Sequence, residues 1–325
     1  MRHPFARILT VVLAVGLTTA AATDASRSGG GDNPRTQLSI IAPAAPGGGW
    51  DTFGREAQQA LMTNGIVNAV RVRNVPGAAG TIGLTQFVQL AGRTDSLLVT
   101  GGVMVGGVIL QDSDATLEDT TPIARLADDY NVLVVPADSP YQTLDEFLAA
   151  WREHPGMAIA GGSLGSIDHL LTGMLADAAG IDPALVNYIA YSGGGEVVRS
   201  MISGSAVGAI SGANDFDAQI EAGELRALGV SSATPVEELS TPTFIEQGVD
   251  VSMSNWRGLV APPDIPDEVR DELIAIIAEM RETDEWRDTL GRNNWTDEFM
   301  AGDEFARFLD AEIATTEDII RELGQ

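Results

Sequence analysis

The chain has 325 residues and a formal net charge of −27, and its 19 basic residues are all Arg. It contains neither Lys nor Cys, which excludes a Walker phosphate loop, a Schiff-base lysine, a thiol nucleophile, a disulfide and a cysteine zinc site. Such strong acidity also argues against nucleic acid as a partner.

The N-terminus has the pattern of a secretory signal peptide. Two Arg residues precede a short apolar run at 8–17, and alanines at 20–22 supply small residues for cleavage. The run is shorter than the roughly 20 residues of a membrane-spanning helix, although an uncleaved anchor is the alternative. We therefore predict a signal peptide at 1–22, a flexible leader at 23–35, and an exported, soluble chain in the periplasm or another extracytoplasmic compartment.

The rest of the chain alternates short strands with helices, which is typical of an α/β protein with mostly parallel sheets. Asp51 is placed to cap the first helix, and Ser166 to cap a helix that ends at Gly180. Thr143 and Glu146 form a capping box. In chain order the pattern predicts a strand at 37–43, a helix at 51–62, a strand at 68–75, a glycine turn and helix at 76–91, strands at 95–102 and 130–137, a helix at 143–151, a strand at 156–162, a helix at 166–180, a strand, turn and helix at 186–204, a strand ending in a polar loop at 205–215, strands at 224–232 and 251–262, and helices at 266–287 and 303–323.

A glycine turn that leads into a helix recurs at 47–51, 77–81, 161–166 and 193–196. Each such helix start offers unpaired N–H groups and a dipole that favours an anion by roughly 0.3–1 kcal/mol. In an open parallel sheet, ligands bind where strands end and helices begin. Turns that face one another across a cleft would hold a carboxylate, whereas tight-turn chemistry alone explains any single one.

Two enzyme motifs are weaker alternatives. Residues 161–165 match the G-x-S-x-G hydrolase pattern, but the only His after Ser163 is His169, too close on the same turn for a catalytic triad. Ser163 is therefore interpreted as a hydroxyl donor. The glycines at 47–49 are followed by Thr52 where a dinucleotide fingerprint needs Gly. Three scattered His residues do not suggest a metal cluster.

Three carboxylates and one indole near the turns have two interpretations each. Asp51, Asp168 and Asp215 are either ordinary helix caps or groups that order a turn or waters around a ligand. A carboxylate cannot itself accept a hydrogen bond from an ionised ligand. Trp50 is either a cleft wall or a packing residue.

Several motifs in order resemble a known family: "APGGGWD", "NVPGAAGTIG", "TGG", "GGSLGSIDHL", "YIAYSGGGE" and "WRGLVAPPDIP". They resemble the extracytoplasmic receptors of tripartite tricarboxylate transporters, the TctC/Bug family, and look most like its citrate-type branch. The resemblance implies a monomeric type II periplasmic-binding-protein fold in which two α/β lobes close over a small carboxylate. It implies no enzyme activity and no cofactor or metal, and delivery of the ligand to membrane permease subunits. A type II binding protein for another solute, such as an amino acid, is the alternative.

The family's binding loops carry over by position. The resemblance implies one lobe from 36–133 with 254–325 and another from 134–253, joined near Leu133 and Ser254. The family's more usual Lys after Tyr191 is Ser192 here, which removes a positive charge near the cleft. The implied ligand-binding residues are Gly47, Gly48, Gly49, Trp50, Asp51, Ala78, Ala79, Gly80, Thr81, Thr100, Gly101, Gly102, Ser163, Gly165, Ser166, Asp168, Tyr191, Gly193, Gly194, Asn214 and Asp215.

Overall fold

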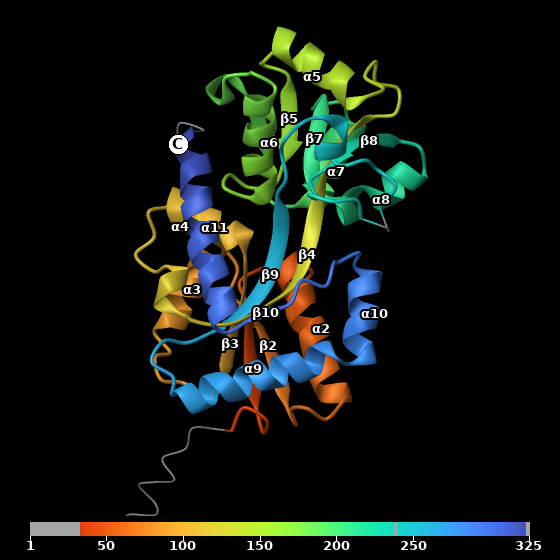
Figure 1. Cartoon of the computed structure of the whole chain (residues 1–325). Helices are drawn as coiled ribbons and strands as arrows, with labels where there is room; N and C mark the ends of the chain where they lie inside the picture. Colours follow the sequence, from red (N-terminus) through yellow and green to blue (C-terminus); the bar gives the residue numbers. More distant parts are fainter. Residues whose placement is uncertain (1–32, 237–238, 323–325) are drawn as a thin grey trace, which may run out of the picture.

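A computed structural model describes residues 33–236 and 239–322 of the chain. The predicted signal peptide and nearly all of the predicted leader lie outside the described residues. Two α/β lobes are connected by the long strands β4 (Thr121–Pro136) and β9 (Ser254–Ala261) (Figure 1). The two-lobed α/β class expected from the sequence is confirmed.

The order of elements follows the alternating pattern expected from the sequence. The other strands are β1 (Leu38–Ala42), β2 (Val70–Asn74), β3 (Ser96–Gly101), β5 (Ala158–Gly161), β6 (Asn187–Ala190), β7 (Gly208–Gly212), β8 (Leu225–Val230) and β10 (Met300–Ala301). The helices are α2 (Gly49–Thr63), α3 (Thr81–Val88), α4 (Gly102–Leu110), α5 (Leu144–Glu153), α6 (Ile167–Ala178), α7 (Gly194–Ile202), α8 (Ala213–Glu221), α9 (Asp267–Arg281), α10 (Asp284–Arg292) and α11 (Asp303–Glu322), with short 3₁₀ turns η1 (Ala78–Gly80), η2 (Leu117–Asp119), η3 (Pro183–Leu185) and η4 (Ile245–Gln247).

One sheet runs through both lobes in the order β2-β1-β3-β9-β4-β7-β5-β6, and β8 and β10 also pair with β4. The outer strands pair in parallel, β1 with β2 and β3, and β5 with β6 and β7. The central pairs are antiparallel. The sheets are therefore mixed rather than mostly parallel, because the strands that cross between the lobes run back against their neighbours.

Strand β4 belongs to both lobes. Its residues 121–130 pair with β9, and its residues 131–136 pair with β7 and β8. The change of partner falls between Tyr130 and Asn131. The exact lobe boundaries implied by the resemblance remain a prediction.

Apolar faces of the helices build the cores. The buried side chains of α2 include Phe53 and Leu61. The Phe53 ring packs edge-on against Trp286 of α10, with ring centroids 5.6 Å apart. In the other lobe Phe147 and Trp151 of α5 are buried together. Each such side chain stabilises the fold by about 1.5–3 kcal/mol through burial.

Four segments differ from the sequence-based expectation. The sequence patterns predict neither α4 nor the first half of β4. The polar loop expected after β7 is helix α8, and the helix expected at 266–287 is broken, because Thr283 caps the separate helix α10. Helix α4 has weak intrinsic propensity because it contains three glycines, and close packing explains them. A Cβ at Gly106 would overlap the carbonyl oxygen of Gly165 in the other lobe.

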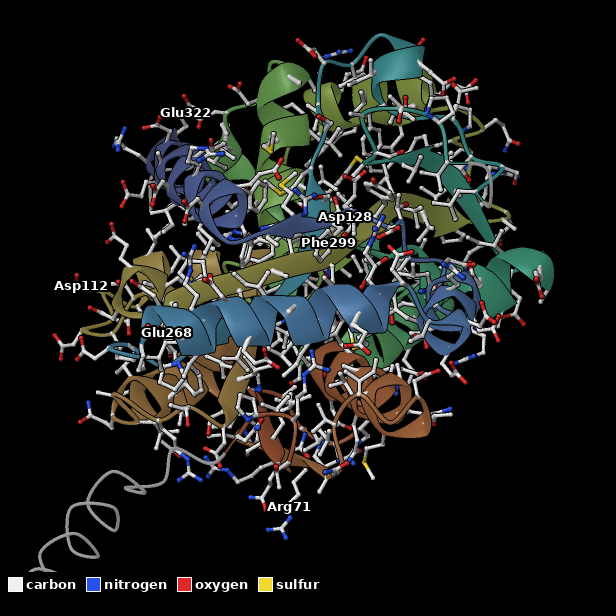
Figure 2. All side chains as sticks on the ribbon, turned by 60° about the horizontal axis from the view of Figure 1, so that its bottom comes forward. Arg71, Asp112, Asp128, Glu268, Phe299 and Glu322 are labelled. Atoms are coloured by element: carbon white, nitrogen blue, oxygen red, sulfur yellow. The ribbon has the colours of Figure 1, made fainter. Side chains whose placement is uncertain are left out.

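The acidic excess lies on the surface. Asp112, Glu268 and Glu322 are exposed and point away from the body of the protein (Figure 2). Among residues 33–236 and 239–322, no helix combines the length and apolar character needed to cross a bilayer.

Candidate functional site

Five helices begin after a glycine, which has no side chain to cap their first turn; such a start is called open here. The residues before α2, α3, α4, α7 and α8 are Gly48, Gly80, Gly101, Gly193 and Gly212, and no side chain makes a capping hydrogen bond at any of them. The first N–H groups of a helix have no partner inside the helix and carry the positive end of its dipole. Three of the four predicted glycine turns are thus confirmed as open helix starts.

The fourth predicted turn, before α6, is closed. The Ser166 hydroxyl accepts a hydrogen bond from the His169 N–H at 3.4 Å, as the predicted cap requires, and Gly180 follows the end of the helix in a left-handed conformation. The hydroxyl of Thr143 caps α5 in the same way, so both hydroxyl caps are confirmed. The predicted capping box is incomplete, because the Glu146 carboxylate accepts from the Gln142 N–H at 2.6 Å instead of the Thr143 N–H.

Trp50 holds three of the open turns together. A Cβ at Gly80 would lie 2.7 Å from Trp50 Cζ3, and a Cβ at Gly101 would lie 3.2 Å from its Nε1. The half-buried indole therefore packs against the starts of both α3 and α4 while it stands in the first turn of α2. Only glycine leaves room for this ring at position 80, and at position 101 a Cβ would also lie 2.4 Å from the Trp256 carbonyl oxygen. Close approach thus explains two of the predicted site glycines.

Asp51 orders its own turn. Its carboxylate accepts hydrogen bonds from the Gly47 N–H at 2.7 Å, Asn74 Nδ2 at 2.8 Å and Arg55 Nε at 3.0 Å. Burial opposes ionisation, but these donors outweigh it and lower the pKa of Asp51. Asp51 is not the helix cap expected from the sequence, since α2 already begins at Gly49.

The turn before α3 adopts a rare backbone conformation. Ala78 and Ala79 both have φ of 51°, a left-handed value that non-glycine residues seldom adopt. Gln111 Nε2 and the Thr81 hydroxyl donate to the Ala78 carbonyl at 3.0 and 2.9 Å, which holds the turn in place. Strain of this kind is concentrated at ligand sites.

Asp168 is the buried carboxylate of the second lobe. It accepts from Asn131 Nδ2 at 2.5 Å and from the Gly162 N–H at 2.7 Å, and it is 9% exposed. Burial raises its pKa to about 6, with the neighbouring Asp215 adding to the effect. Its two hydrogen bonds tie the loop after β5 to β4.

Arg257 of β9 ties the first turn of α2 to β4. Its guanidinium donates to the Gly49 carbonyl at 3.0 Å and to Asp129 at 2.7 Å. Burial raises the pKa of Asp129 to about 6 despite this partner.

Asp215 lies between the starts of two helices, and burial raises its pKa. It accepts from the Ser211 hydroxyl at 2.8 Å, and a Cβ at Gly194 would overlap its carboxylate. The starts of α7 and α8 thus meet at Asp215.

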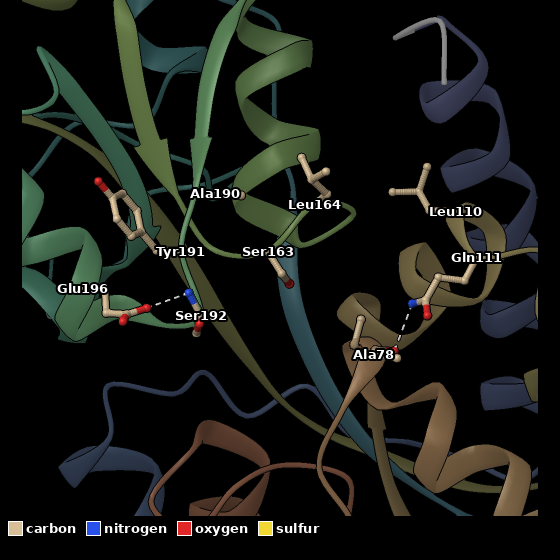
Figure 3. A pocket seen from close by; sticks show the side chains of 10 residues that line it. Ala78, Leu110, Gln111, Ser163, Leu164, Ala190, Tyr191, Ser192 and Glu196 are labelled. Carbon is tan, nitrogen blue, oxygen red and sulfur yellow. Dashed lines mark hydrogen bonds between the residues drawn. The ribbon is translucent and has the colours of Figure 1, made fainter.

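A cavity of about 660 Å³ opens between the lobes (Figure 3). Figure 3 shows Ser163 and Leu164 on one side, facing Ala78 and Leu110 on the other. The residues that line it are Ala78, Ala79, Leu110, Gln111, Ser163, Leu164, Ala190, Tyr191, Ser192 and Glu196.

A profile described as "Tripartite tricarboxylate transporter family receptor" matches residues 54–325 of this chain. The chain belongs to this receptor family. It is 28% identical over 325 residues to Protein BugT of Bordetella pertussis, covering 98% of both chains. Proteins of this family are solute-binding receptors rather than enzymes, as the sequence analysis predicts.

Solved structures agree with the fold. A TctC solute-binding protein from Polaromonas is 27% identical, with a TM-score of 0.74, and the match covers 90% of this chain and 100% of that one. The R. palustris protein Rpa4515, solved with adipate, is 22% identical with a TM-score of 0.78, covering 90% and 99% of the two chains.

Because the receptor is not an enzyme, Ser163 has no role as a nucleophile. It is exposed and lines the cavity. His169 is turned to other partners: its Nδ1 accepts from the Gly165 N–H at 3.2 Å, and its ring packs on Tyr188 with centroids 4.7 Å apart. Burial lowers the pKa of His169.

Only part of the predicted set reaches the cavity of this receptor. Four predicted residues line it, namely Ala78, Ala79, Ser163 and Tyr191. The Gly47–Asp51 loop is not among the lining residues. Thr100 is fully buried, with its hydroxyl against Met104. Asn214 donates its amide to the Asn293 carbonyl and accepts from Asn294 at 2.8 Å, in the segment after α10.

Several lining residues have no signal in the sequence. Leu110 and Gln111 lie at the end of α4, a helix that the patterns do not predict. Leu164 and Glu196 are next to predicted residues, and their position within the motifs "GGSLG" and "GGGE" is the only indication in the sequence that either lines the cavity.

Proposed function

We propose that the chain is exported, captures a small organic di- or tricarboxylate such as citrate, and delivers it to the permease of a tripartite tricarboxylate transporter. The observation that carries this proposal is the set of five helices that begin at glycine without a side-chain cap. Main-chain N–H groups at such starts bind carboxylates well, because the anion replaces the missing cap. The related protein Rpa4515, solved with adipate, supports a carboxylate as the ligand.

The net charge of −27 does not oppose this function. Removing residues 1–22 would take away two Arg and no acid, so the exported chain would carry −29. Surface charges are screened beyond about 8 Å at physiological ionic strength, whereas helix starts act within one turn. Binding should therefore persist at moderate salt.

Capture requires the two lobes to move. Lobes at 36–133 with 254–325 and at 134–253 would close about the two connecting strands, since turns from both lobes contribute to one site. A ligand drives closure only by binding the closed form more tightly than the open one. The closed form would then present a different surface to the permease. A decrease in the radius of gyration in small-angle scattering, and a change in Trp50 emission, would accompany ligand binding.

A thermal-shift screen of the purified chain tests the function. Di- and tricarboxylates should raise the melting temperature, and mass spectrometry should recover them chemically unchanged. Neutral sugars and cationic amino acids serve as controls. The proposal is wrong if only the controls stabilise the chain, and closure is wrong if a saturating carboxylate leaves the radius of gyration unchanged.

A further inference from the structure

Two leucines from different lobes face each other in the cavity. Leu110 ends α4, and Leu164 lies in the loop after β5 on the opposite wall (Figure 3). A Cβ at Gly165 would lie 2.6 Å from Leu110 Cδ1, so Leu110 touches the residue next to Leu164. Ala78 and Ala79 extend the apolar wall. A ligand in this cavity is therefore covered by aliphatic side chains from both sides.

Leu164 has apolar surface that such a ligand would bury, because 55% of the residue is exposed. A single exposed leucine needs no explanation by itself. Here it lies in a cavity opposite a second leucine, and a ligand chain between the two would remove apolar surface from water. Leu185 is 58% exposed but does not line the cavity, and it offers a matched comparison.

The negative charge of the same wall disfavours a highly charged anionic ligand. Glu196 is the charged residue of the lining, and its carboxylate accepts from the Ser192 N–H at 2.8 Å. Among the residues that the structure describes, no Arg lines this cavity, and the chain has no Lys. Arg199 lies 3.7 Å from Glu196 but is mostly exposed. An additional ligand carboxylate near this wall would meet a like charge.

We infer that the cavity selects a dicarboxylate whose two carboxylates are joined by an apolar chain, and disfavours a tricarboxylate. This rests on the proposed function, in which open helix starts bind a carboxylate. The apolar chain lies between Leu110 and Leu164, and Glu196 disfavours the third carboxylate of citrate. Leu110, Leu164 and Glu196 thus determine which acid is retained.

Isothermal titration calorimetry with succinate, glutarate, adipate and citrate tests the selection. The three dicarboxylates carry the same charged groups and differ only in methylenes. Each added methylene should tighten binding by up to about fourfold, which corresponds to about 0.8 kcal/mol. Citrate should bind the wild type at least tenfold more weakly than adipate.

Variants locate the effect. Leu164→Ser should remove most of the dependence on chain length, whereas Leu185→Ser, matched in residue type and exposure, should keep it. Glu196→Gln should narrow the difference between citrate and adipate. Leu164 and Glu196 are at the surface of the cavity and Leu185 is exposed elsewhere, so circular dichroism should show an intact fold for all three variants.

The outcomes separate this inference from the function on which it rests. Equal affinity for the three dicarboxylates, or tighter binding of citrate than of adipate, overturns the selection and leaves a carboxylate receptor. Loss of the chain-length dependence in Leu185→Ser also overturns it, since the effect would not be local to the cavity. No binding of any of the four acids overturns both.

Discussion

Two helices beside the cleft, α3 and α7, begin differently from α5 and α10, which support the lobes. Thr143 and Thr283 close the first turns of α5 and α10 with their hydroxyls. In contrast α3 and α7 begin at Gly80 and Gly193, where no side chain takes that place. A capped start satisfies its N–H groups within the protein, whereas an open start leaves them to solvent or to a bound anion.

Helix α6 shows that a helix beside the cleft can also have a capped start. It borders the cleft but is capped by Ser166, and its contribution to the cavity comes from the preceding residues Ser163 and Leu164. Under the proposed function, anion binding would therefore belong to particular turns rather than to every glycine-rich segment. That function also predicts that changes at open starts affect binding, and changes at capped starts affect stability.

Filling an open start should have the largest effect. In Gly193→Val the added side chain has free space, because no atom lies within 4 Å of its Cβ position and the backbone is extended. The fold should be retained, while the side chain blocks ligand access to the α7 N–H groups. We expect adipate affinity to fall at least tenfold, about 1.4 kcal/mol, by calorimetry.

Gly156→Val is the matched control, since its Cβ would also meet nothing within 4 Å and it lies outside the cavity. It should bind normally. Normal binding by Gly193→Val as well would show that this start does not contact the ligand.

The buried carboxylates behind the open starts should make stability depend on pH. The folded-state pKa of about 6 for Asp168 and Asp129 exceeds the ordinary value near 3.9. The native state therefore binds more protons than the unfolded state between those values. The free energy of unfolding should fall as pH rises from about 4 to about 6.

Asp168→Asn should flatten this fall by on the order of 1–2 kcal/mol in urea titrations at several pH values. Asp177→Asn changes an exposed carboxylate on the same helix and should leave the slope unchanged. An identical slope in wild type and Asp168→Asn would count against Asp168 as a source of the effect.

Removing a capping hydroxyl should have a smaller effect, and it should lower stability rather than ligand affinity. Thr143→Ala leaves the Glu146 N–H without its 3.2 Å partner, so the free energy of unfolding should drop by about 1 kcal/mol. Adipate affinity at a temperature where the variant is folded should not change. A change in affinity with no loss of stability would reverse the distinction between capped and open starts.

The smallest effect should come from Ser163→Ala. If the exposed hydroxyl makes the proposed ligand contact, its loss should weaken binding by no more than about 1 kcal/mol. The wild type should not hydrolyse an ester substrate in a spectrophotometric assay. Ester turnover that disappears in the variant would contradict the assignment as a receptor.

Local signals made much of this structure predictable from the sequence. The caps at Thr143 and Ser166 were visible because a hydroxyl and a following acidic or apolar pattern are local features. Helix α4 was not visible, since its three glycines lower its propensity and only contact with Gly165 and Ala79 explains them. Tertiary packing outweighs propensity at this helix.

The site was predictable in its turns but not in its walls. Glycines before α2, α3 and α7 stand out in the sequence, whereas Leu110 and Gln111 reach the cavity only because α4 packs beside η1. Arg257 has no local motif that links it to Gly49 and Asp129. Pairing of β9 with β4 brings it to Asp129, and the contact with Gly49 depends on where α2 lies beside the sheet. Long-range pairing of this kind is not encoded in a short pattern.

Calorimetric titration of the purified chain with adipate and with its diamide, adipamide, tests the central claim most directly. The two molecules share length and apolar chain and differ in the charge of their ends. If open helix starts hold a carboxylate, adipate should bind at physiological ionic strength, and adipamide should bind at least tenfold more weakly. Equal binding of both, or binding of adipamide alone, would contradict the account.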